Sequence, residues 1–432
     1  MDLMVRVIGG GLAGSEAAWM IARQGVRVIL QEMRPDRMTP AHSTGLLGEL
    51  VCSNSLKSMD ILSAQGLLKE ELKRMGSLIL EAAEHSAIPG GKALVVDRHK
   101  FAGHITARLE DHPLVEIRRE EARGVPEGIA VIATGPLTSD AFAESLKGLT
   151  GQEFLYFYDA LSPIISAESL DTSRMFWADR HGWDQGAYLN APMSEEEYRR
   201  FYEALVAAEV HNPRFDEQIP YFEGCLPVEV MARRGYETLA YGPMRPSGLV
   251  DPATGEEPFA AVQLRPENAD KTAFSLVGFQ TQLKTREQDR VFRMIPGLGN
   301  AEFLRHGAVH RNTYLNAPRL LNPTLELRAK PGIFIAGQLS GTEGYLEAAA
   351  GGLLAGMNAA RLAMGKRPLP FPAHTALGTL FSAITAASEK NYQPTNLHLA
   401  LFTDVPEGLH GKARREFITR RAMEELEDFT RG

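Results

Sequence analysis

The sequence is poor in cysteine and lacks long apolar runs. Only Cys52 and Cys225 among its 432 residues are cysteines, too few for the disulfide framework of a small secreted protein. No stretch approaches the ~18 consecutive apolar residues of a transmembrane helix. Val5 opens an apolar run without a charged and then apolar leader before it. We therefore expect a cytoplasmic protein that has no membrane partner.

The cysteine spacing also argues against two kinds of site. No C-x-x-C or C-x-x-x-x-C pair occurs, so the chain offers neither the cysteine spacing of a zinc site nor the redox pair of a disulfide reductase. We expect no metal site.

An excess of positive charge is absent as well. The chain has 46 basic and 54 acidic residues, which gives a net charge of −8. Such a chain does not coat nucleic acid by bulk charge, although a local basic face is compatible with it. At ~150 residues per domain the length predicts two or three domains. The hydrophobic fraction of 44% suits a globular enzyme with a sizeable core.

The strongest motif lies in the first 35 residues. An apolar run over 5–8 is followed by a glycine turn, a segment with helical apolar spacing, and a second apolar run that ends at Glu32. The turn consists of Gly9, Gly10, Gly11, Leu12, Ala13 and Gly14. This order of strand, glycine turn, helix, strand and acid is the dinucleotide-binding fingerprint. Its glycines let a pyrophosphate approach the helix N-terminus, and Glu32 is placed to bind the adenosine ribose.

Two later segments indicate which dinucleotide binds. Residues 128–136 predict a buried strand that ends in a turn at Gly135, where small residues let the backbone lie against a flat ligand. Residues 332–338 predict a strand that reaches Gly337 and Gln338, with Tyr345 and a small-residue helix over 348–363 beyond it. FAD proteins of the glutathione-reductase type complete their flavin site with such a second element. We therefore expect FAD rather than NAD.

The fold class predicted from these elements is α/β, a glutathione-reductase-type FAD-binding Rossmann domain with an inserted α+β domain. We expect the FAD domain over 1–150 and 291–365, the inserted substrate or tRNA domain over 151–290, and a mostly helical segment over 366–432. The pattern predicts one helix over 64–85 and a polar loop over 35–60. It also predicts a helix from Ser194 to Glu209 that begins with a capping box formed by Ser194 and Glu197.

Several longer segments resemble one known family along nearly the whole chain. They are VIGGGLAGSEAAW, EMRPDRMTPAHSTG, LVCSNSLKS, FEGCLPVE, VGFQTQLK, RMIPGLGNAEF, HRNTYLNAP and IAGQLSGTEGYLEAAAGGLLAGMNAA. In these segments the chain resembles the folate- and FAD-dependent tRNA (uracil-5-)-methyltransferases. It is more distantly similar to glucose-inhibited division protein A, a longer flavoprotein that modifies wobble uridines.

The resemblance implies a reaction and its co-substrates. It implies that 5,10-methylenetetrahydrofolate gives a one-carbon unit to C5 of uridine-54 in the T loop of tRNA. Reduced FAD would give the hydride, and NAD(P)H would reduce the flavin again. The product would be 5-methyluridine.

This chemistry explains why both cysteines are candidates. C5 of uracil becomes nucleophilic only after a group has added to C6, and a thiolate is well suited to that addition. A base must then remove the C5 proton. Cys225 is the expected C6 nucleophile or its partner, while Cys52 would protect a flavin-bound intermediate or act as acid or base; the sequence does not separate the two roles. Tyr345 is a candidate to pack on the flavin ring, and His42 and His310 are candidate proton relays.

A further set of basic residues are candidates for phosphate contacts with tRNA. They are Arg233, Arg234, Arg245, Lys284, Arg286, Lys412, Arg414 and Arg415. Three alternatives stay open: another uridine-modifying flavoprotein, a small-molecule flavin oxidoreductase, and a tRNA-binding folding factor that keeps FAD for structure. The choice between NADH and NADPH and the oligomeric state also stay open.

Overall fold

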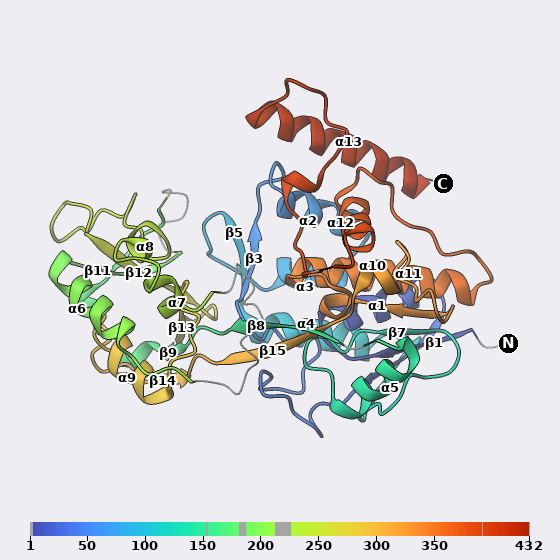
Figure 1. Ribbon diagram of the computed structural model, residues 1–432, viewed down its shortest axis with the longest axis horizontal. Helices are drawn as coiled ribbons and strands as arrows, with labels where there is room; N and C mark the ends of the chain where they lie inside the picture. The colour runs from blue at the N-terminus through green and yellow to red at the C-terminus, as the bar shows by residue number, and fades with distance from the viewer. Residues whose placement is uncertain (1–2, 153, 181–186, 212–225, 391, 432) are drawn as a thin grey trace.

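The computed structural model describes residues 3–152, 154–180, 187–211, 226–390 and 392–431. Cys225 therefore lies outside the described residues. Two units built on different sheets lie side by side, and strands β8 (Leu155–Ala160) and β15 (Val309–Tyr314) run between them as an antiparallel pair (Figure 1).

The first unit contains the dinucleotide motif. Its elements are β1 (Met4–Ile8), α1 (Leu12–Arg23), β2 (Arg27–Glu32), β3 (Ser55–Ser58), α2 (Ala64–Arg74), α3 (Leu78–His85), β4 (Ala87–Ile88), β5 (Ala93–Val96), α4 (Arg98–Glu110), β6 (Val115–Arg119), β7 (Ala130–Ile132), α5 (Asp140–Thr150), α10 (Ala317–Leu320), β16 (Ile333–Ile335), α11 (Tyr345–Ala363), α12 (Ala376–Ala386) and α13 (Gly411–Arg431). Five strands form a parallel sheet in the order β16-β7-β1-β2-β6. Strands β7 and β16 are apolar and buried throughout, whereas the edge strand β6 alternates between half-buried and exposed residues. The α/β class is confirmed.

The helices α1 and α11 touch backbone to backbone. A β-carbon at Gly352 would lie 2.1 Å from the carbonyl oxygen of Ala13, and one at Gly356 would lie 2.5 Å from that of Ala17. Glycine is therefore required at both positions of α11 for this close approach. Because α1 follows the first glycine turn and α11 follows the second, this contact brings the two glycine turns together.

The second unit is a six-stranded antiparallel sheet with its own core. Its elements are β9 (Ile164–Ser166), β10 (Phe176–Trp177), β11 (Leu189–Met193), α6 (Glu195–Val206), α7 (Val228–Ala232), α8 (Thr238–Tyr241), β12 (Ala260–Pro266), β13 (Ala273–Leu276), α9 (Thr285–Phe292) and β14 (Phe303–Arg305). The strand order is β10-β11-β12-β13-β9-β14. The predicted capping box is present: Ser194 Oγ accepts the N–H of Glu197, and the Glu197 carboxylate accepts the N–H of Ser194.

The predicted domain boundary at residue 290 stays a prediction. Phe292, Ile295 and Leu298 are buried in the core of the second sheet, and β14 at residues 303–305 is its edge strand. On this packing we propose that the inserted unit returns to the first one near residue 305.

Two predicted elements of the first unit were wrong. The single helix over 64–85 is interrupted between α2 and α3, because Gly76 adopts a φ of +75° and Ser77 caps the new helix through the N–H of Leu80. Residues 55–58 form β3, which pairs with β5, although the stretch was predicted as loop. In addition, α11 begins at Tyr345 rather than at Ala348.

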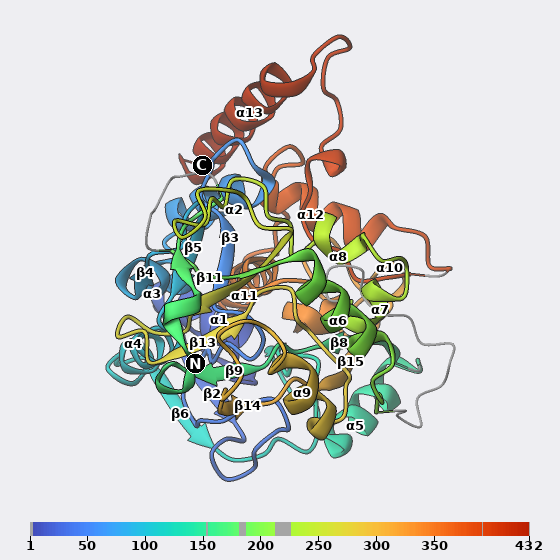
Figure 2. The same cartoon turned by 90° about the vertical axis from the view of Figure 1, so that its left-hand side faces the viewer.

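The C-terminal segment contains helices α12 and α13. Glu71 of α2 accepts the N–H groups of Ala376 and Leu377 at the start of α12. Helix α13 lies above α2 and α12 at the outer edge of the molecule in both views (Figures 1 and 2). Among the residues that the structure describes, no helix is both long and apolar enough to cross a bilayer.

Candidate functional site

The first glycine turn forms a cradle at the N-terminus of α1. Gly9 has a φ of +99°, and a β-carbon at Gly14 would lie 1.7 Å from the Gly9 carbonyl oxygen. At Gly11, by contrast, a β-carbon would meet no atom of the described chain within 4 Å. The turn therefore has a closed side, where helix and strand pack, and an open side facing a cavity. The open N–H groups of a helix N-terminus favour phosphate there.

A cavity of about 490 Å³ joins the two glycine elements. Its wall includes these predicted residues: Gly9, Gly11, Leu12, Ala13, Glu32, Cys52, Gly135, His42, His310, Gly337, Gln338 and Tyr345. A β-carbon at Gly337 would lie 2.8 Å from the β-carbon of Ala13, so the second glycine turn stands directly against the first. Gly10 and Gly14 stand behind this wall, where Gly10 supports Glu32 and Gly14 packs on Gly9.

Glu32 is held rigidly at one end of the cavity. Its Oε2 accepts the N–H of Gly10 at 2.7 Å, and its Oε1 accepts the backbone N–H and the Nε–H of Arg34 at 2.9 and 3.0 Å. Burial opposes ionisation, but the hydrogen bonds and charge of Arg34 outweigh it and hold the pKa of Glu32 below its usual value. An ionised carboxylate at this point can accept hydrogen bonds from a ribose.

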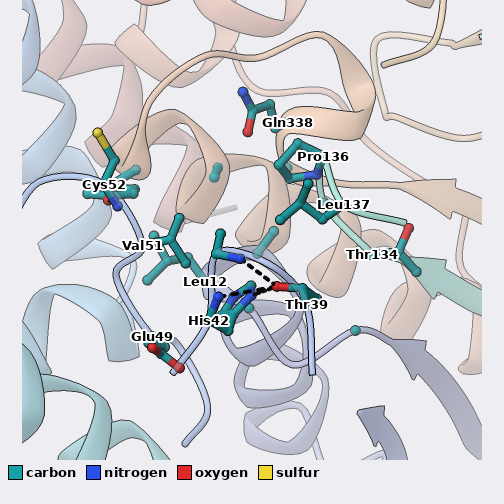
Figure 3. A pocket seen from close by; sticks show the side chains of 18 of the residues that line it. Leu12, Thr39, His42, Glu49, Val51, Cys52, Thr134, Pro136, Leu137 and Gln338 are labelled. Carbon is teal, nitrogen blue, oxygen red and sulfur yellow. Dashed lines mark hydrogen bonds between the residues drawn. The ribbon is translucent and has the colours of Figure 1, made fainter. Parts of the chain in front are cut away.

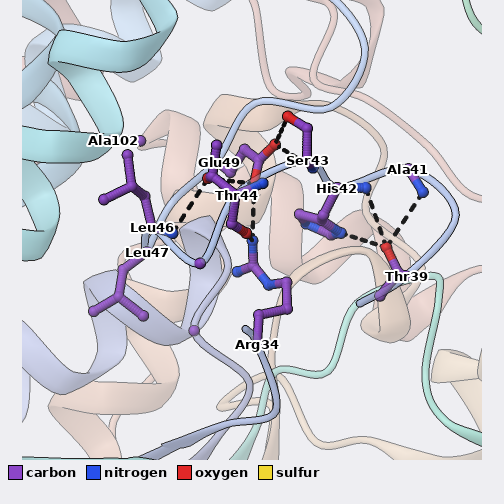
Figure 4. A network of polar contacts seen from close by, with 12 residues as sticks. Arg34, Thr39, Ala41, His42, Ser43, Thr44, Leu46, Leu47, Glu49 and Ala102 are labelled. Carbon is purple, nitrogen blue, oxygen red and sulfur yellow. Dashed lines mark hydrogen bonds and ion pairs between the residues drawn. The ribbon is translucent and has the colours of Figure 1, made fainter. Parts of the chain in front are cut away.

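A network of polar side chains surrounds Arg34 (Figure 4). Arg34 is itself buried and bridges Glu32 to Glu49, at 3.1 Å from the Glu49 Oε2. His42 lies at this end of the cavity. Its Nδ1 is 2.6 Å from the Oγ1 of Thr39. Burial and the charge of Arg34 lower the pKa of His42, so its ring is neutral near pH 7. Figure 3 shows His42 and Glu49 in the lower part of the cavity and Cys52 in the upper part.

Cys52 forms part of the cavity wall on a loop that is fixed through its backbone. The N–H groups of Cys52 and Ser53 donate to Tyr345 Oη at 2.8 and 3.1 Å. The carbonyl groups of Leu50 and Cys52 accept from Arg98 at 2.5 and 2.6 Å. Tyr345, at the first position of α11, thus connects the cysteine loop to the second glycine element.

The second sheet supplies two more arginines to this loop. In the register of the sheet, Arg265 on β12 lies opposite Ser275 on β13. Ser275 pairs with Ile164 on β9, and Ile164 pairs with Arg305 on β14. Arg265 and Arg305 therefore belong to one row across the sheet. Arg305 Nη1 donates to the Val51 carbonyl at 3.0 Å, and Arg265 Nη2 donates to Ser53 Oγ at 2.9 Å.

The electrostatics of this end favour protonated groups. Burial, with a smaller contribution from Asp159, raises the pKa of Cys52 to about 12, against the opposing charges of Arg98 and Arg305. Burial followed by the charge of Asp159 likewise raises the pKa of Glu343. Cys52 is therefore a thiol near neutral pH. Both Asp159 and Glu343 line the cavity.

His310 also faces this part of the cavity. Its Nε2 is buried without a hydrogen-bond partner among the described residues, and burial together with the charge of Arg305 lowers its pKa. The ring is thus neutral and keeps an unused nitrogen for a ligand. His306, four residues earlier, is paired with Asp289 at 2.9 Å instead. Within the described ranges no group of three or more His, Cys, Asp or Glu side chains is close enough to hold a metal ion.

The predicted tRNA contacts lie away from this cavity. Of the eight residues, Arg414 is half-buried and donates to the carbonyl groups of Leu399 and Phe402, so it supports the chain before α13. The other seven are exposed. Lys284 pairs with Glu209 at 2.7 Å. Helix α9, which begins after Lys284, and α13 stand at opposite corners in Figure 1. The eight residues therefore do not form one patch.

Sequence reasoning missed the residues that fix the cysteine loop. Arg98 reaches this loop from the start of α4, and Arg265 and Arg305 reach it only because the second sheet faces the 50–53 loop. Asp159 was missed for the same reason. Glu343 had a signal in the sequence, since it lies in the GTEGY part of the second glycine element.

Comparison with known proteins fits this geometry. The family model described as "Glucose inhibited division protein A" matches residues 4–367. A protein of Heliobacterium modesticaldum named methylenetetrahydrofolate–tRNA-(uracil-5-)-methyltransferase TrmFO is 55% identical over 429 residues, which cover 99% of this chain and 98% of the relative. The protein of that name in Desulforudis audaxviator is 57% identical over 403 residues, covering 93% and 92%.

A solved structure agrees on the fold. GidA of Aquifex aeolicus superposes with a TM-score of 0.69 at 18% identity, over 98% of this chain and 73% of that one. At this identity the likeness concerns the fold alone, which is the FAD-binding Rossmann type with an inserted unit. Relatives above 50% identity over nearly the full length decide the family. The chain belongs to the TrmFO family of methylenetetrahydrofolate–tRNA-(uracil-5-)-methyltransferases.

Proposed function

We propose that this chain transfers the one-carbon unit of 5,10-methylenetetrahydrofolate to C5 of uridine-54 in the T loop of tRNA and so forms 5-methyluridine. In this proposal FAD is the resident cofactor and NAD(P)H its reductant. The main observation in support of this proposal is that a dinucleotide cradle and a cysteine thiol line the same cavity of about 490 Å³. The names of the relatives supply the reaction class.

The residues present fit FAD. The open side of Gly11 leaves room for a pyrophosphate at the N-terminus of α1, and the ionised Glu32 suits the adenosine ribose. The flat wall made by Gly135, Gly337 and Tyr345 suits a planar ring system at the cysteine end. When bound there, FAD supplies the hydride that converts an exocyclic methylene on C5 into a methyl group.

The cysteines would share the covalent work on the uracil. A thiolate adds to C6, the electrons move to the C4 oxygen, and C5 then attacks the one-carbon unit. We assign the C6 addition to Cys225. Cys52 suits the role of acid better than that of nucleophile, because burial keeps it as a thiol and its loop is fixed by Tyr345, Arg98 and Arg305.

The C5 proton needs an acceptor before the thiol can leave C6. The carboxyl groups of Asp159 and Glu343 line the cysteine end of the cavity, and His310 offers a neutral ring nitrogen beside them. We propose that the neutral ring of His310 takes up the proton, with Asp159 opposite it on β8, whereas the raised pKa of Glu343 makes that group a proton donor. Gln338 donates to Glu343 Oε2 at 2.5 Å and so fixes the orientation of that carboxyl group.

One assay tests the proposal. FAD-loaded protein is incubated with unmodified tRNA, 5,10-methylenetetrahydrofolate and NAD(P)H, and the tRNA is digested and analysed for 5-methyluridine. We expect the modified nucleoside at position 54 and nowhere else. A matched tRNA with cytidine at that position is the control and should stay unmodified. Failure to form the product with active cofactor would refute the proposed function.

The remaining alternatives are less well supported. A wobble-uridine enzyme would be expected to have relatives of that name at high identity, whereas the relatives at 50–57% identity carry the methyltransferase name. A disulfide reductase would need a second cysteine close to Cys52 in sequence, and none exists. A folding factor without catalysis has no need for a thiol in the wall of the cofactor cavity.

A further inference from the structure

A second, smaller cavity of about 210 Å³ lies between the two units. Its wall is formed by Gly90, Lys92, Asp179, Arg180, Tyr188 and Gln263. The first two come from the turn before β5 in the first unit, and the last four come from the second unit. None of these residues belongs to the dinucleotide cradle or to the cysteine loop.

The two cavities follow one face of strand β12. Arg265 lines the large cavity and Gln263 lines the small one. Because side chains alternate along a strand, residues two apart point to the same face, about 7 Å from each other. Tyr188 precedes β11, the neighbouring strand, and burial raises its pKa against the opposing charges of Arg265 and Arg180. Arg265 and Gln263 thus place the cysteine end of the large cavity and the small cavity along one face of β12.

The small cavity contains a cation with unused hydrogen-bonding capacity. Arg180 Nη2 donates to the Pro243 carbonyl at 3.0 Å, but its Nε is buried without a partner among the residues that the structure describes. Burial and the nearby charge of Arg245 lower the pKa of Arg180, so its surroundings favour the arrival of an anion. Lys92 adds a second positive charge to the wall, and Asp179 offsets part of it.

The position of Arg180 is fixed by the backbone. A β-carbon at Gly248 would lie 2.1 Å from the Arg180 carbonyl oxygen, so the two segments are in direct contact. The guanidinium group is thus presented by a packed element of the second unit. A planar guanidinium whose Nε has no partner among the described residues is suited to an oxygen of a carboxylate.

We propose that the small cavity is a subsite for the glutamyl carboxylates of the folate co-substrate, with Arg180 as its anchoring residue. This inference rests on the proposed function. The pterin end of the folate would lie in the large cavity beside Cys52, and its tail would pass along β12 across Tyr188 and Gln263. A carboxylate tail fits better than a tRNA phosphate, because the subsite is small, its wall includes an acid, Asp179, and it lies on the same face of β12 as the co-substrate cavity.

Equilibrium binding tests the subsite without turnover. The affinity of the FAD-loaded protein for tetrahydrofolate and for tetrahydropteroate, which lacks the glutamate, is measured from the change in flavin absorbance. We expect Arg180→Gln to weaken tetrahydrofolate binding on the order of 10-fold, the effect of one charge-assisted hydrogen bond, and to leave tetrahydropteroate binding unchanged. Arg200→Gln, an exposed arginine on α6 of the same unit, is the matched control and should change neither.

A second variant protects the test against misfolding. Asp179→Asn removes the negative charge from the same wall and should tighten tetrahydrofolate binding while leaving tetrahydropteroate unaffected. Equal effects of Arg180→Gln on both ligands would overturn the inference. The inference would also be overturned if Arg180→Gln weakened the binding of NAD(P)H or of tRNA alone, because the cavity would then bind a phosphate.

The inference and the proposed function fail in different ways. If wild-type protein forms 5-methyluridine but Arg180→Gln binds both folates like wild type, the subsite is refuted and the function stands. If wild-type protein forms no 5-methyluridine, the proposed function is refuted and the subsite with it.

Discussion

The contact between α1 and α11 gives the sharpest prediction about how the fold forms the cofactor site. Replacing Gly352 with alanine places a β-carbon 2.1 Å from the Ala13 carbonyl oxygen. Since an ordinary contact needs about 3.5 Å, the helices must separate by roughly 1 Å. Such overpacking costs about 1–3 kcal/mol. Ala13 also lines the FAD cavity, so the separation should distort the cradle itself.

The expected result is a loss of both stability and cofactor. A cost of about 2 kcal/mol corresponds to a fall in Tm of about 4–8 °C for a domain of this size. Thermal unfolding of the FAD-loaded protein and flavin absorbance after gel filtration measure the two effects. We expect the Tm of Gly352→Ala to fall and its flavin content to drop below that of wild type.

Gly103→Ala is the matched control for this substitution. Gly103 is also inside a helix, α4, but a β-carbon there would meet no described atom within 4 Å. Alanine is the better helix former, by up to about 1 kcal/mol, so this variant should be as stable as wild type or more stable. If Gly352→Ala melted like Gly103→Ala and kept its FAD, the close helix contact would not be what forms the cradle.

Three further predictions follow from the site and the tail. Cys225→Ala should abolish 5-methyluridine yet leave FAD bound; loss of flavin would show that the residue is misplaced. Burial raises the pKa of Glu71 from 4.5 to about 8, so the folded protein binds an extra proton and loses stability as pH rises from 4.5 to 8. Over this pH range the Tm of Glu71→Gln should therefore fall less than the Tm of wild type. Parallel curves of Tm against pH would contradict this. Arg415→Gln should raise the KM for tRNA without changing the Tm. Arg414→Gln should lower the Tm, because the carbonyl groups of Leu399 and Phe402 lose their donor. The opposite pattern would refute both roles.

Much of this structure follows from local patterns in the sequence. The strand, glycine turn and helix at residues 4–23 form as predicted, because Gly9 takes a positive φ and Gly14 packs directly on Gly9, requirements that glycine alone meets. The capping box at Ser194 and the helical tail are equally local. The helix over 64–85 was wrong because its apolar stripe continues through Gly76, where a positive φ ends α2 and Ser77 starts α3.

What the sequence by itself determined was the presence of a dinucleotide-binding element, the preference for FAD and the family, since these depend on short motifs with fixed spacing. Only the tertiary structure decided what surrounds Cys52. Arg98, Arg265 and Arg305 reach its loop from a helix and two strands of separate units, and no sequence spacing relates them. Burial between those units, rather than the residue type, keeps the thiol protonated.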